Sequence, residues 1–349
     1  MSLLVRYRDL LARPGEHFPI TLGEGGTPLI HARRLGAELG LDRLYLKFEG
    51  TNPTGSFKDR GMVLAVNRAV AAGASAVICA STGNTSASAS AYAAAAGIAC
   101  FVVLPAGKVA SGKLAQAIAA GARLISVAGN FDQALEAVRR LGEEGTTVVV
   151  NSVNPDRIAG QQTAAWEIVD ELGAAPDAVA LPVGNAGNIT ACWAGFTRYA
   201  DTGRTDGKRP RMLGFQAAGA APIVNGAPVE APETVATAIR IGNPASWAGA
   251  VAARDESGGL IEAVTDAQIL EMQLRIARSE GIFCEPASAA GVAGVARLAA
   301  ERRLHRSETV VCILTGHGLK DPEIVRAGEL PDPIPPTFDA IRKAILAPA

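Results

Sequence analysis

The sequence predicts an α/β fold in which buried parallel sheets carry helices on both faces. From residue 43 onward, short apolar or β-branched runs alternate with amphipathic, alanine-rich stretches. Of the 349 residues, 48% are hydrophobic and 19% are charged, as in a globular enzyme. Strands that are buried on both faces appear as continuous apolar runs, and their alternation with helices favours parallel pairing through helical crossovers.

The predicted elements alternate along the chain. The predicted strands are 43–49, 76–80, 100–104, 123–127, 146–150, 177–183, 212–216 and 309–314. The predicted helices are 57–72, 85–96, 112–120, 132–141, 160–171, 189–199, 266–280, 286–301 and, on the surface after a proline-rich stretch, 338–346. In parallel sheets, ligands gather at the carboxyl ends of the strands, so the loops that open each helix are the places to search for chemistry.

The composition argues against several classes of function. The formal net charge of -1 indicates no basic surface for nucleic acid or an anionic membrane. Residues 1–13 contain scattered charges and no continuous apolar core, so they do not form a signal peptide. The 5 cysteines and 4 histidines show no metal-ligand spacing. We therefore expect reduced core thiols, no metal, no nucleic-acid or membrane partner, and a cytoplasmic protein.

One loop-to-helix corner carries a lysine in an unusual place. The segment 52–61 reads Asn-Pro-Thr-Gly-Ser-Phe-Lys-Asp-Arg-Gly, and its Asn-Pro and Thr-Gly pairs predict a sharp turn. Ser56 is a suitable N-cap and Asp59 falls in the first helical turn, which places Lys58 at the helix start. The partial positive charge there favours the neutral amine, the form that attacks a carbonyl. From this pattern alone, a solvated lysine remains the alternative.

Three further strand-to-helix loops are rich in polar groups or glycine. The loop 81–86, Ser-Thr-Gly-Asn-Thr-Ser, places hydroxyls and backbone N–H groups at a helix N-terminus, which suits carboxylate or phosphate oxygens. The loop 184–188, Gly-Asn-Ala-Gly-Asn, allows N–H groups to converge on an anion, although it matches neither the P-loop nor the dinucleotide fingerprint. After the strand 309–314, Thr315 would direct its hydroxyl into the crevice. His317 is either a base or, as we favour, a structural side chain.

Together these loops resemble the pyridoxal-phosphate (PLP) enzymes of the tryptophan-synthase-β-like fold, fold type II, and among them the threonine synthases. The resemblance covers most of the chain, from 23–29 to 316–322. The segments most similar to threonine synthases are 52–61, 151–155 (Asn-Ser-Val-Asn-Pro), 239–247 (Ile-Arg-Ile-Gly-Asn-Pro-Ala-Ser-Trp) and 316–321 (Gly-His-Gly-Leu-Lys-Asp).

The resemblance implies an architecture of two doubly wound α/β domains with PLP in the cleft between them. The small domain would span 52–150 and would be inserted in a large domain made of 1–51 and 151–349, which carries the PLP phosphate cup. Members of the family are commonly dimers, so we expect a homodimer.

The resemblance also assigns cofactor contacts. Lys58 matches the Schiff-base lysine that shuttles protons, Asn84 matches the residue bonded to the ring hydroxyl oxygen, and Thr315 matches the hydroxyl at the pyridine nitrogen. The phosphate cup is matched by Gly184, Asn185, Ala186, Gly187 and Asn188. A neutral hydroxyl at the ring nitrogen leaves that nitrogen largely unprotonated and weakens the electron sink.

The implied reaction converts O-phospho-L-homoserine and water to L-threonine and phosphate, by γ-elimination and then β-addition of water. The positions that match substrate-phosphate contacts are Thr85, Ser152, Arg157 and Asn185. Those that match the substrate carboxylate are Ser81, Thr82 and Thr85. Arg157 is the main phosphate contact because its planar fork pairs well with a dianion, and Lys113 is a weaker candidate.

Three alternatives remain open. A threonine or serine dehydratase of the same fold would release ammonia and a keto acid, and would leave Arg157 and Ser152 without a phosphate to bind. The motifs exclude poorly a lyase that acts on another phosphorylated amino acid. A PLP-binding protein without turnover is disfavoured by Lys58 together with the complete hydroxyl loop 81–86.

Overall fold

The computed structural model describes residues 1–106, 111–128, 131–143, 147–324 and 332–346. The strands are β1 (Leu29–His31), β2 (Arg43–Phe48), β3 (Ala76–Ala80), β4 (Ala99–Pro105), β5 (Arg123–Val127), β6 (Val148–Val149), β7 (Ala178–Pro182), β8 (Arg211–Ala217), β9 (Leu260–Val264) and β10 (Thr309–Leu314). The first helices are α1 (Leu3–Arg6), α2 (Arg8–Leu11), α3 (Arg33–Leu39), α4 (Lys58–Ala71), α5 (Asn84–Ala96), α6 (Ser111–Ala119), α7 (Phe131–Glu143) and α8 (Pro155–Gln161). The later helices are α9 (Thr163–Leu172), α10 (Gly187–Asp201), α11 (Pro222–Asn225), α12 (Trp247–Glu256), α13 (Asp266–Glu280), α14 (Pro286–Ala300) and α15 (Phe338–Leu346). Short 3₁₀ turns are η1 (Glu49–Thr51), η2 (Thr237–Ile239), η3 (Gly318–Lys320) and η4 (Pro322–Ile324).

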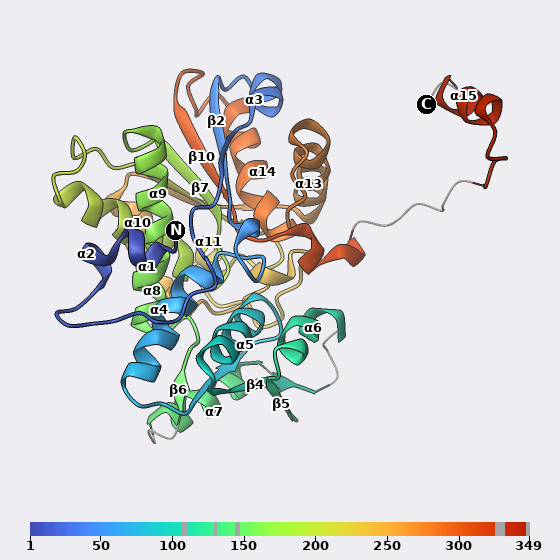
Figure 1. Cartoon of the computed structure of the whole chain (residues 1–349). Coiled ribbons are helices and arrows are strands. Elements are labelled where there is room, and N and C mark those ends of the chain that lie inside the picture. Colours follow the sequence, from blue (N-terminus) through green and yellow to red (C-terminus); the bar gives the residue numbers. More distant parts are fainter. Residues whose placement is uncertain (107–110, 129–130, 144–146, 325–331, 347–349) are drawn as a thin grey trace.

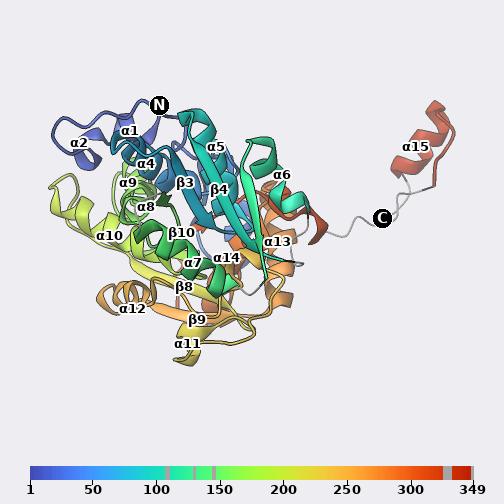
Figure 2. The ribbon, with the colours of Figure 1, turned by 90° about the horizontal axis from the view of Figure 1, so that it is seen from below.

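The strands form two sheets, which lie in different halves of the molecule (Figures 1 and 2). The larger sheet is 6-stranded in the order β1-β2-β10-β7-β8-β9, and the smaller is 4-stranded in the order β5-β4-β3-β6. The described strand pairs are parallel, apart from the antiparallel pair of β1 and β2. Strands β3, β7 and β10 are buried at every residue, as expected for strands covered on both faces. The predicted parallel α/β class is therefore confirmed.

The predicted elements recur within a few residues, with differences at several places. The predicted helix 160–171 is in fact two helices, α8 and α9, which meet at Gln162. The edge strands β1 and β9 lie outside the predicted set, and the predicted strand 146–150 narrows to β6, residue 146 being outside the described part. Helix α15 forms as predicted, but it does not pack on the surface: none of its residues is buried, and Figure 1 shows it apart from the body.

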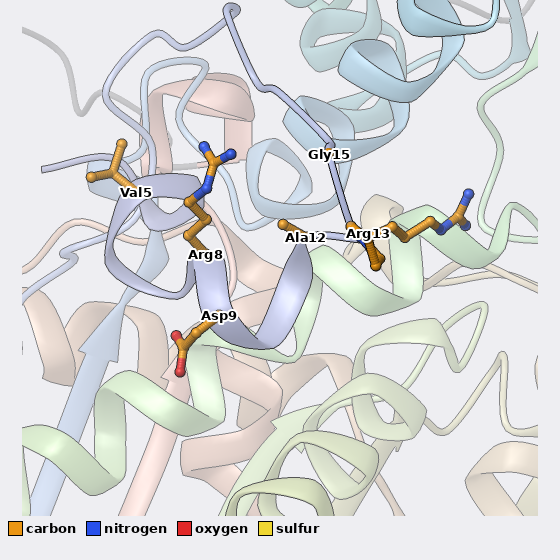
Figure 3. A pocket seen from close by; sticks show the side chains of 7 residues that line it. Val5, Arg8, Asp9, Ala12, Arg13 and Gly15 are labelled. Carbon is orange, nitrogen blue, oxygen red and sulfur yellow. The ribbon is translucent and has the colours of Figure 1, made fainter.

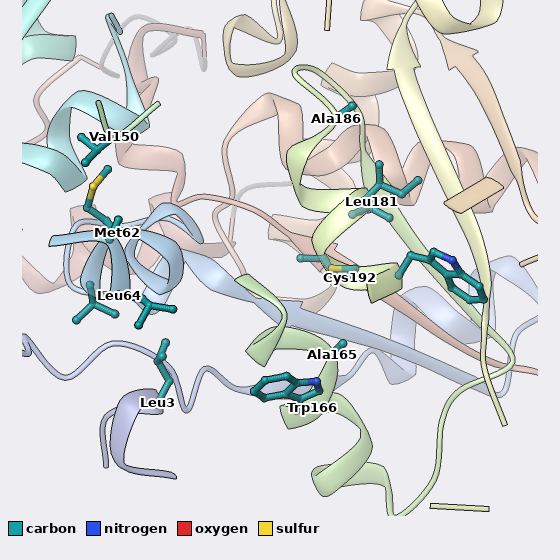
Figure 4. Close-up of a cluster of buried hydrophobic side chains, with 14 of the residues drawn as sticks. Leu3, Met62, Leu64, Val150, Ala165, Trp166, Leu181, Ala186 and Cys192 are labelled. Carbon is teal, nitrogen blue, oxygen red and sulfur yellow. The ribbon is translucent and has the colours of Figure 1, made fainter. Parts of the chain in front are cut away.

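Helix α4 lies within the main hydrophobic cluster. Its buried Met62 and Leu64 share that cluster with Leu3 near the N-terminus, with Val150 after β6 and with Trp166 of α9 (Figure 4). A second cluster includes alternate residues of β2, β7 and β10 together with α3, α13 and α14, so it fills the opposite face of the larger sheet. Within the described part of the chain, no helix has the length and hydropathy needed to cross a bilayer.

The register of β2 and β10 brings two of the four polar loops together. Leu314 pairs with Phe48, so the chain leaves both strands at the same edge of the larger sheet. The Phe57 N–H then donates to the Thr315 carbonyl at 3.0 Å. The corner 52–61 is thereby fixed against the loop that follows β10.

An asparagine joins two further loops at the edge of the smaller sheet. Strand β3 pairs with β6, and the Asn151 side chain continues this pairing beyond β6. Its Oδ1 accepts from the Ala80 N–H at 3.0 Å, and its Nδ2 donates to the Ala80 carbonyl at 2.9 Å. These two bonds hold the loop 81–86 beside the segment 151–155.

Helices α4 and α8 approach each other so closely that only glycine fits between them. A Cβ on Gly160 would lie 2.1 Å from the Arg60 carbonyl oxygen, and one on Gly61 would lie 2.4 Å from the Arg157 carbonyl oxygen. Because backbone atoms cannot yield as flexible side chains do, we predict that Gly160→Ala lowers the free energy of unfolding by about 2 kcal/mol. Chemical denaturation measures this. In Gly83→Ala the added Cβ meets nothing within 4 Å; an equal loss in that control would contradict the prediction.

Candidate active site

The corner that carries Lys58 is held by a carboxylate rather than by the expected cap. Helix α4 begins at Lys58 with Phe57 as its N-cap, and no side chain caps it. The prediction of Ser56 as N-cap is therefore wrong: its buried Oγ has no hydrogen-bond partner in the described chain. Asp59 does lie in the first turn, where it accepts from the Thr54 N–H at 2.7 Å, the Thr54 hydroxyl at 2.6 Å and the Ser88 hydroxyl at 2.6 Å. These bonds fix the turn that presents Lys58.

The amine of Lys58 lies in surroundings that disfavour its charge. Its Nζ is 4.3 Å from the centroid of the Phe57 ring. Burial, and to a lesser extent the nearby charge of Arg157, lower the pKa of Lys58 to about 7, although the carboxyl group of Glu285 opposes both effects. The direction agrees with the sequence prediction, but burial, rather than the helix terminus, is the leading cause. The neutral amine is therefore far more accessible near neutral pH than in an exposed lysine.

The hydroxyl loop 81–86 turns the chain from β3 into α5. The Ser81 hydroxyl accepts from the Gly83 N–H at 3.2 Å and from the Ser86 N–H at 3.3 Å, so this side chain organises the loop itself. Thr82 and Thr85 are partly buried, and Asn84 is the first residue of α5. The loop thus places its amide and hydroxyls at the N-terminus of a helix of 13 residues, where anions are favoured.

A buried glutamate brings Asn84 and Thr315 together from the two halves of the molecule. Asn84 Nδ2 donates to Glu285 Oε2 at 2.9 Å, and Thr315 Oγ1 donates to Glu285 Oε1 at 3.0 Å. The Ser288 hydroxyl lies 3.0 Å from that of Thr315. Glu285 and Ser288 were not among the predicted site residues. The only sequence signal for them is the Glu-Pro-Ala-Ser start of α14, which reads as an ordinary helix beginning.

The glycine-rich loop 184–188 forms a tight turn into α10. A Cβ on Gly184 would lie 2.8 Å from the Ile239 Cα, so the backbone fits only as glycine there. Ala186 adopts a left-handed φ of 65°, and Gly187 then starts α10. The buried Asn188 Nδ2 has no partner among the described residues. A helix N-terminus with an unpartnered amide suits a phosphate group.

Asn185 connects this loop to the predicted substrate side. Its Nδ2 donates to the Ser152 hydroxyl, and its Oδ1 accepts from the Ala245 N–H at 2.6 Å. The next residue, Ser246, also contacts the loop, since its N–H donates to the Asn185 carbonyl at 3.2 Å. Ser246 lay within a segment of the family resemblance but was not predicted as a site residue; its proximity follows from tertiary packing.

Arg157 is a buried cation that is largely unpaired. Its Nη1 donates to the Val150 carbonyl at 2.6 Å, whereas Nε and Nη2 have no hydrogen-bond partner in the described regions. Burial lowers the pKa of Arg157 to about 10, against the weaker attraction of Cys79 and Asp59. Its charge reaches Lys58, whose pKa it depresses. A buried guanidinium with such free donor atoms would be stabilised by an anionic ligand.

The sequence also offered His317 as a possible base and Lys113 as a weaker phosphate contact. His317 Nδ1 accepts from the Leu319 N–H at 3.1 Å and caps η3, while its ring lies near those of Phe48 and Phe283. These contacts give His317 a structural role. Lys113 lies in α6, and its side chain is outside the described residues.

Surface depressions are also found away from these residues. One cavity of about 610 Å³ is formed by the N-terminal segment around α2 and is lined by none of the predicted site residues (Figure 3). The five cysteines are buried free thiols, as predicted. Among the described residues, no group of three or more His, Cys, Asp or Glu side chains is placed to hold a metal ion.

Comparison with known proteins first defines the class. A family model described as "Pyridoxal-phosphate dependent enzyme" matches residues 20–316. The structure of maize serine racemase is similar with a TM-score of 0.73 at 21% identity, over 91% of this chain and 94% of that one. The processed form of threonine deaminase isoform 2 from Solanum lycopersicum is similar with a TM-score of 0.71 at 22% identity, over 87% and 88%. The fold and the family model thus define a PLP-dependent enzyme.

Curated relatives narrow the class. Threonine synthase of Mycobacterium tuberculosis (strain ATCC 25618 / H37Rv) is 57% identical over 92% of this chain and 89% of its own length. That of Synechocystis sp. is 55% identical over 95% of this chain and 88% of its own length. That of Methanosarcina acetivorans is 51% identical over 99% of this chain and 87% of its own length. The chain therefore belongs to the threonine synthase family of PLP-dependent enzymes.

The residues present fit the cofactor. PLP needs an amine that reacts with its aldehyde and a site for its phosphate. Lys58, with a pKa of about 7, supplies such an amine. The loop 184–188 supplies the N-terminus of α10, the unpartnered amide of Asn188 and a backbone that a side chain on Gly184 would displace.

The lowered pKa of Lys58 makes stability depend on pH. In the unfolded chain the lysine pKa is about 10.4. Below pH 7 both states hold the ammonium, so the native protein carries the full cost of burying it. Between pH 7 and pH ~10.4 the unfolded state binds more protons, so stability rises with pH. We predict that Lys58→Met stabilises the cofactor-free protein more at pH 6 than at pH 9. Urea denaturation at both pH values checks this; an identical difference at both would refute the lowered pKa.

Proposed function

We propose that this chain converts O-phospho-L-homoserine and water to L-threonine and phosphate, by γ-elimination and β-addition of water. The shared name of its relatives supports the product. One observation carries the substrate: Arg157 is a fully buried cation, two of whose donor atoms have no partner in the described part of the chain, and it is close enough to Lys58 to depress its pKa. A phosphorylated substrate supplies the anion that completes this site.

The geometry favours the substrate phosphate over the cofactor phosphate as the partner of Arg157. The cofactor phosphate has its own place in our proposal, at Gly184, Asn185, Ala186, Gly187 and Asn188. Arg157 lies instead in α8, which follows the segment 151–155. Asn185 belongs to the cofactor loop and also donates to Ser152, so the two proposed anion sites are adjacent and share one amide.

The other contacts are proposed from the same layout. The loop 81–86 offers Ser81, Thr82 and Thr85 to the substrate carboxylate, while Thr85, Ser152, Arg157 and Asn185 contact its phosphate. Asn84 and Thr315 contact the ring of PLP at its hydroxyl oxygen and its nitrogen. Because carboxylate and phosphate are then held at opposite ends, the bond from Cα to hydrogen is oriented toward Lys58.

The chain's own residues perform the proton transfers. PLP, when bound, withdraws electron density and so stabilises negative charge on the substrate carbons. Once the substrate amine has released it from the cofactor, Lys58 removes the proton from the substrate Cα and returns protons to carbons farther along the substrate. A pKa of about 7 suits an amine that must both take and give protons. Arg157 balances the charge that develops on the departing phosphate. Since Arg157 is covered by protein, the two halves must open to admit substrate and close again before reaction.

Organisation and location form a second part of the proposal. We infer that the smaller sheet belongs to a domain spanning 52–150, inserted in a large domain of 1–51 and 151–349. The burial of five free thiols supports a reducing, cytoplasmic location.

A homodimer is supported by α15, a helix of 9 residues that is too short to be stable alone. Its exposed apolar side chains lack a covering surface among the described residues (Phe338, Ile341, Ile345, Leu346).

Replacing the proposed anchor lysine tests the cofactor assignment. Lys58→Ala should lower kcat by about 10⁴-fold or more, because no other group replaces the amine. Borohydride should attach PLP to the wild-type peptide that contains residue 58 and leave the variant unlabelled, as read by mass spectrometry. Lys208→Ala removes an exposed lysine paired with Asp177 and should behave as wild type. Full labelling of the Lys58→Ala protein would refute the assignment.

Replacing Arg157 tests the substrate. Arg157→Met should lower kcat/KM for phosphohomoserine by about 100-fold or more, because the phosphate loses its buried charge partner. The visible absorption of bound PLP should persist, since the cofactor phosphate lies in another loop. The assay measures threonine, phosphate and 2-ketobutyrate together. Arg209→Met, an exposed arginine paired with Asp201, is the control. Ketobutyrate formed from threonine, with phosphohomoserine inert, would instead indicate a dehydratase.

A further inference from the structure

Ser246 stands at a helix start but does not cap its helix. It is the N-cap residue of α12, a helix of 10 residues, yet its hydroxyl makes no capping bond there. Its backbone N–H donates instead to the Asn185 carbonyl at 3.2 Å. The neighbouring Ala245 N–H donates to the Asn185 side chain at 2.6 Å. The segment before α12 is thereby fixed against the loop 184–188, while the helix leaves the serine hydroxyl available for another partner.

Helices α10 and α12 lie side by side and start at the same end. A Cβ on Gly187, the first residue of α10, would lie 3.9 Å from the Ser246 hydroxyl oxygen. Three residues farther along each helix, a Cβ on Gly249 would lie 2.6 Å from the Thr190 Cγ2, so the two helices run in the same direction. Their first N–H groups, which lack partners within a helix, and the positive ends of both dipoles therefore lie together. Two like ends repel each other, so an anion beside them is stabilising.

Glycine at 187 leaves a space at this shared end. A Cβ there would lie 3.6 Å from the Ile158 Cδ1, 3.7 Å from the Ser152 Cβ and 3.9 Å from the Ser246 Oγ. These are ordinary van der Waals distances, and the φ of Gly187 is not in the left-handed region, so the protein alone would accept an alanine side chain. The space that glycine leaves between the two serines is therefore not required by the packing, and it suits a bound group.

The other side of this space belongs to the proposed substrate-phosphate site. Ser152 accepts a hydrogen bond from Asn185 Nδ2, so the proton of its own hydroxyl remains available to an anion. Ile158 follows Arg157, the buried guanidinium with two donor atoms that have no partner in the described part of the chain. Since Ser152 and Ser246 both lie within 4 Å of one point, a phosphate bound by Ser152 is also within reach of the Ser246 hydroxyl.

We propose that Ser246 is a further specificity-determining residue: its hydroxyl donates a hydrogen bond to the phosphate of the substrate, together with Ser152 and at the shared positive end of α10 and α12. This inference rests on the proposed conversion of phosphohomoserine, which supplies the phosphate. The three oxygens of a phosphate accept more hydrogen bonds than Arg157 and Ser152 supply, and each charge-assisted bond is stronger than a neutral one. An amino acid with an unphosphorylated hydroxyl makes none of these bonds. Ser246 therefore adds to the preference for a phosphorylated substrate over threonine or serine.

The test measures the binding of inorganic phosphate to the PLP-loaded enzyme by isothermal titration calorimetry, because the loaded enzyme has its cofactor phosphate site filled. Ser246→Ala should raise the Kd for phosphate about tenfold, since one charge-assisted hydrogen bond is lost. The KM for phosphohomoserine should rise by a similar factor, while the Kd for PLP in the cofactor-free protein stays at its wild-type value. Ser246→Thr, which keeps the hydroxyl, should recover most of the phosphate affinity.

Ser257→Ala is the matched control at the other end of α12. The Ser257 hydroxyl accepts from the Met212 N–H at 3.0 Å, so its loss should lower the stability of the protein and leave the Kd for phosphate unchanged. Ser246→Ala should do the reverse. Because its hydroxyl makes no capping bond, urea unfolding without phosphate should match that of wild type, and the stability gained from added phosphate should be smaller. A loss of stability without phosphate, with an unchanged Kd for phosphate, would show a structural role and overturn the inference.

Two other results would overturn the role of Ser246. One is a wild-type Kd for phosphate in folded Ser246→Ala. The other is a higher Kd for PLP with unchanged phosphate binding, which would place the hydroxyl at the cofactor phosphate. Should the alanine variant fail to fold, Ser246→Cys decides, because a thiol has nearly the same shape and is a weak donor: a phosphate affinity equal to that of wild type overturns the inference.

The outcome is distinct from a failure of the proposed function. Unchanged KM and Kd values in Ser246→Ala, in an enzyme that makes threonine from phosphohomoserine, overturn only the role of Ser246. Weaker phosphate binding in the variant, in an enzyme that leaves phosphohomoserine intact, supports Ser246 as an anion contact and overturns the substrate assignment. A wild-type enzyme that binds no inorganic phosphate and leaves phosphohomoserine intact overturns both.

Discussion

The interaction on which the site depends is the buried guanidinium of Arg60. Its Nε lies 2.6 Å from Glu49 after β2, and its Nη2 lies 2.6 Å from Glu167 of α9, all three side chains being fully buried. Burial alone would raise the pKa of Glu167, yet Arg60 and Lys47 hold it at about 2. Removing one partner of such a network would leave an uncompensated charge, at a cost of about 3–5 kcal/mol. Arg60 is two residues from Lys58, so this network fixes where α4 begins and hence where the amine lies.

A comparison with Arg60 shows why the buried guanidinium of Arg157 needs an anionic partner. Both guanidinium groups are fully buried and lie on helices in close contact. The carboxylates around Arg60 raise its pKa, whereas burial lowers that of Arg157 to about 10 because no carboxylate bonds it within the described chain. The same fold therefore neutralises one cation and leaves the other in need of an anion. A site that also lowers the Lys58 pKa is held ready for a negatively charged ligand, and this supports the phosphorylated substrate that we propose.

The sequence predicted what depends on local chemistry. Continuous apolar runs predicted β3 and β10 with their observed bounds, since a strand buried on both faces needs apolar side chains throughout. The bounds of β5 were also predicted, although its residues are mostly exposed. The edge strands β1 and β9 are only partly buried at most positions, so their residues carry no such signal. The break at Gln162 depends on how α8 packs on α4, and the failure of Ser56 as a cap depends on Asp59 bonding the preceding turn. Tertiary contacts decide both.

Glu285 marks the limit of prediction from residue types and spacing. Lys58, Asn84 and Thr315 each stand in a loop between a strand and a helix, where chemistry is expected, and the family resemblance assigns their roles. Glu285 is separated from Asn84 by 201 positions, so the contact between them arises only in the folded chain. Its carboxyl group is bonded to both Asn84 and Thr315, so two residues that the loops nominate are held in place by a third that the loop motifs do not contain.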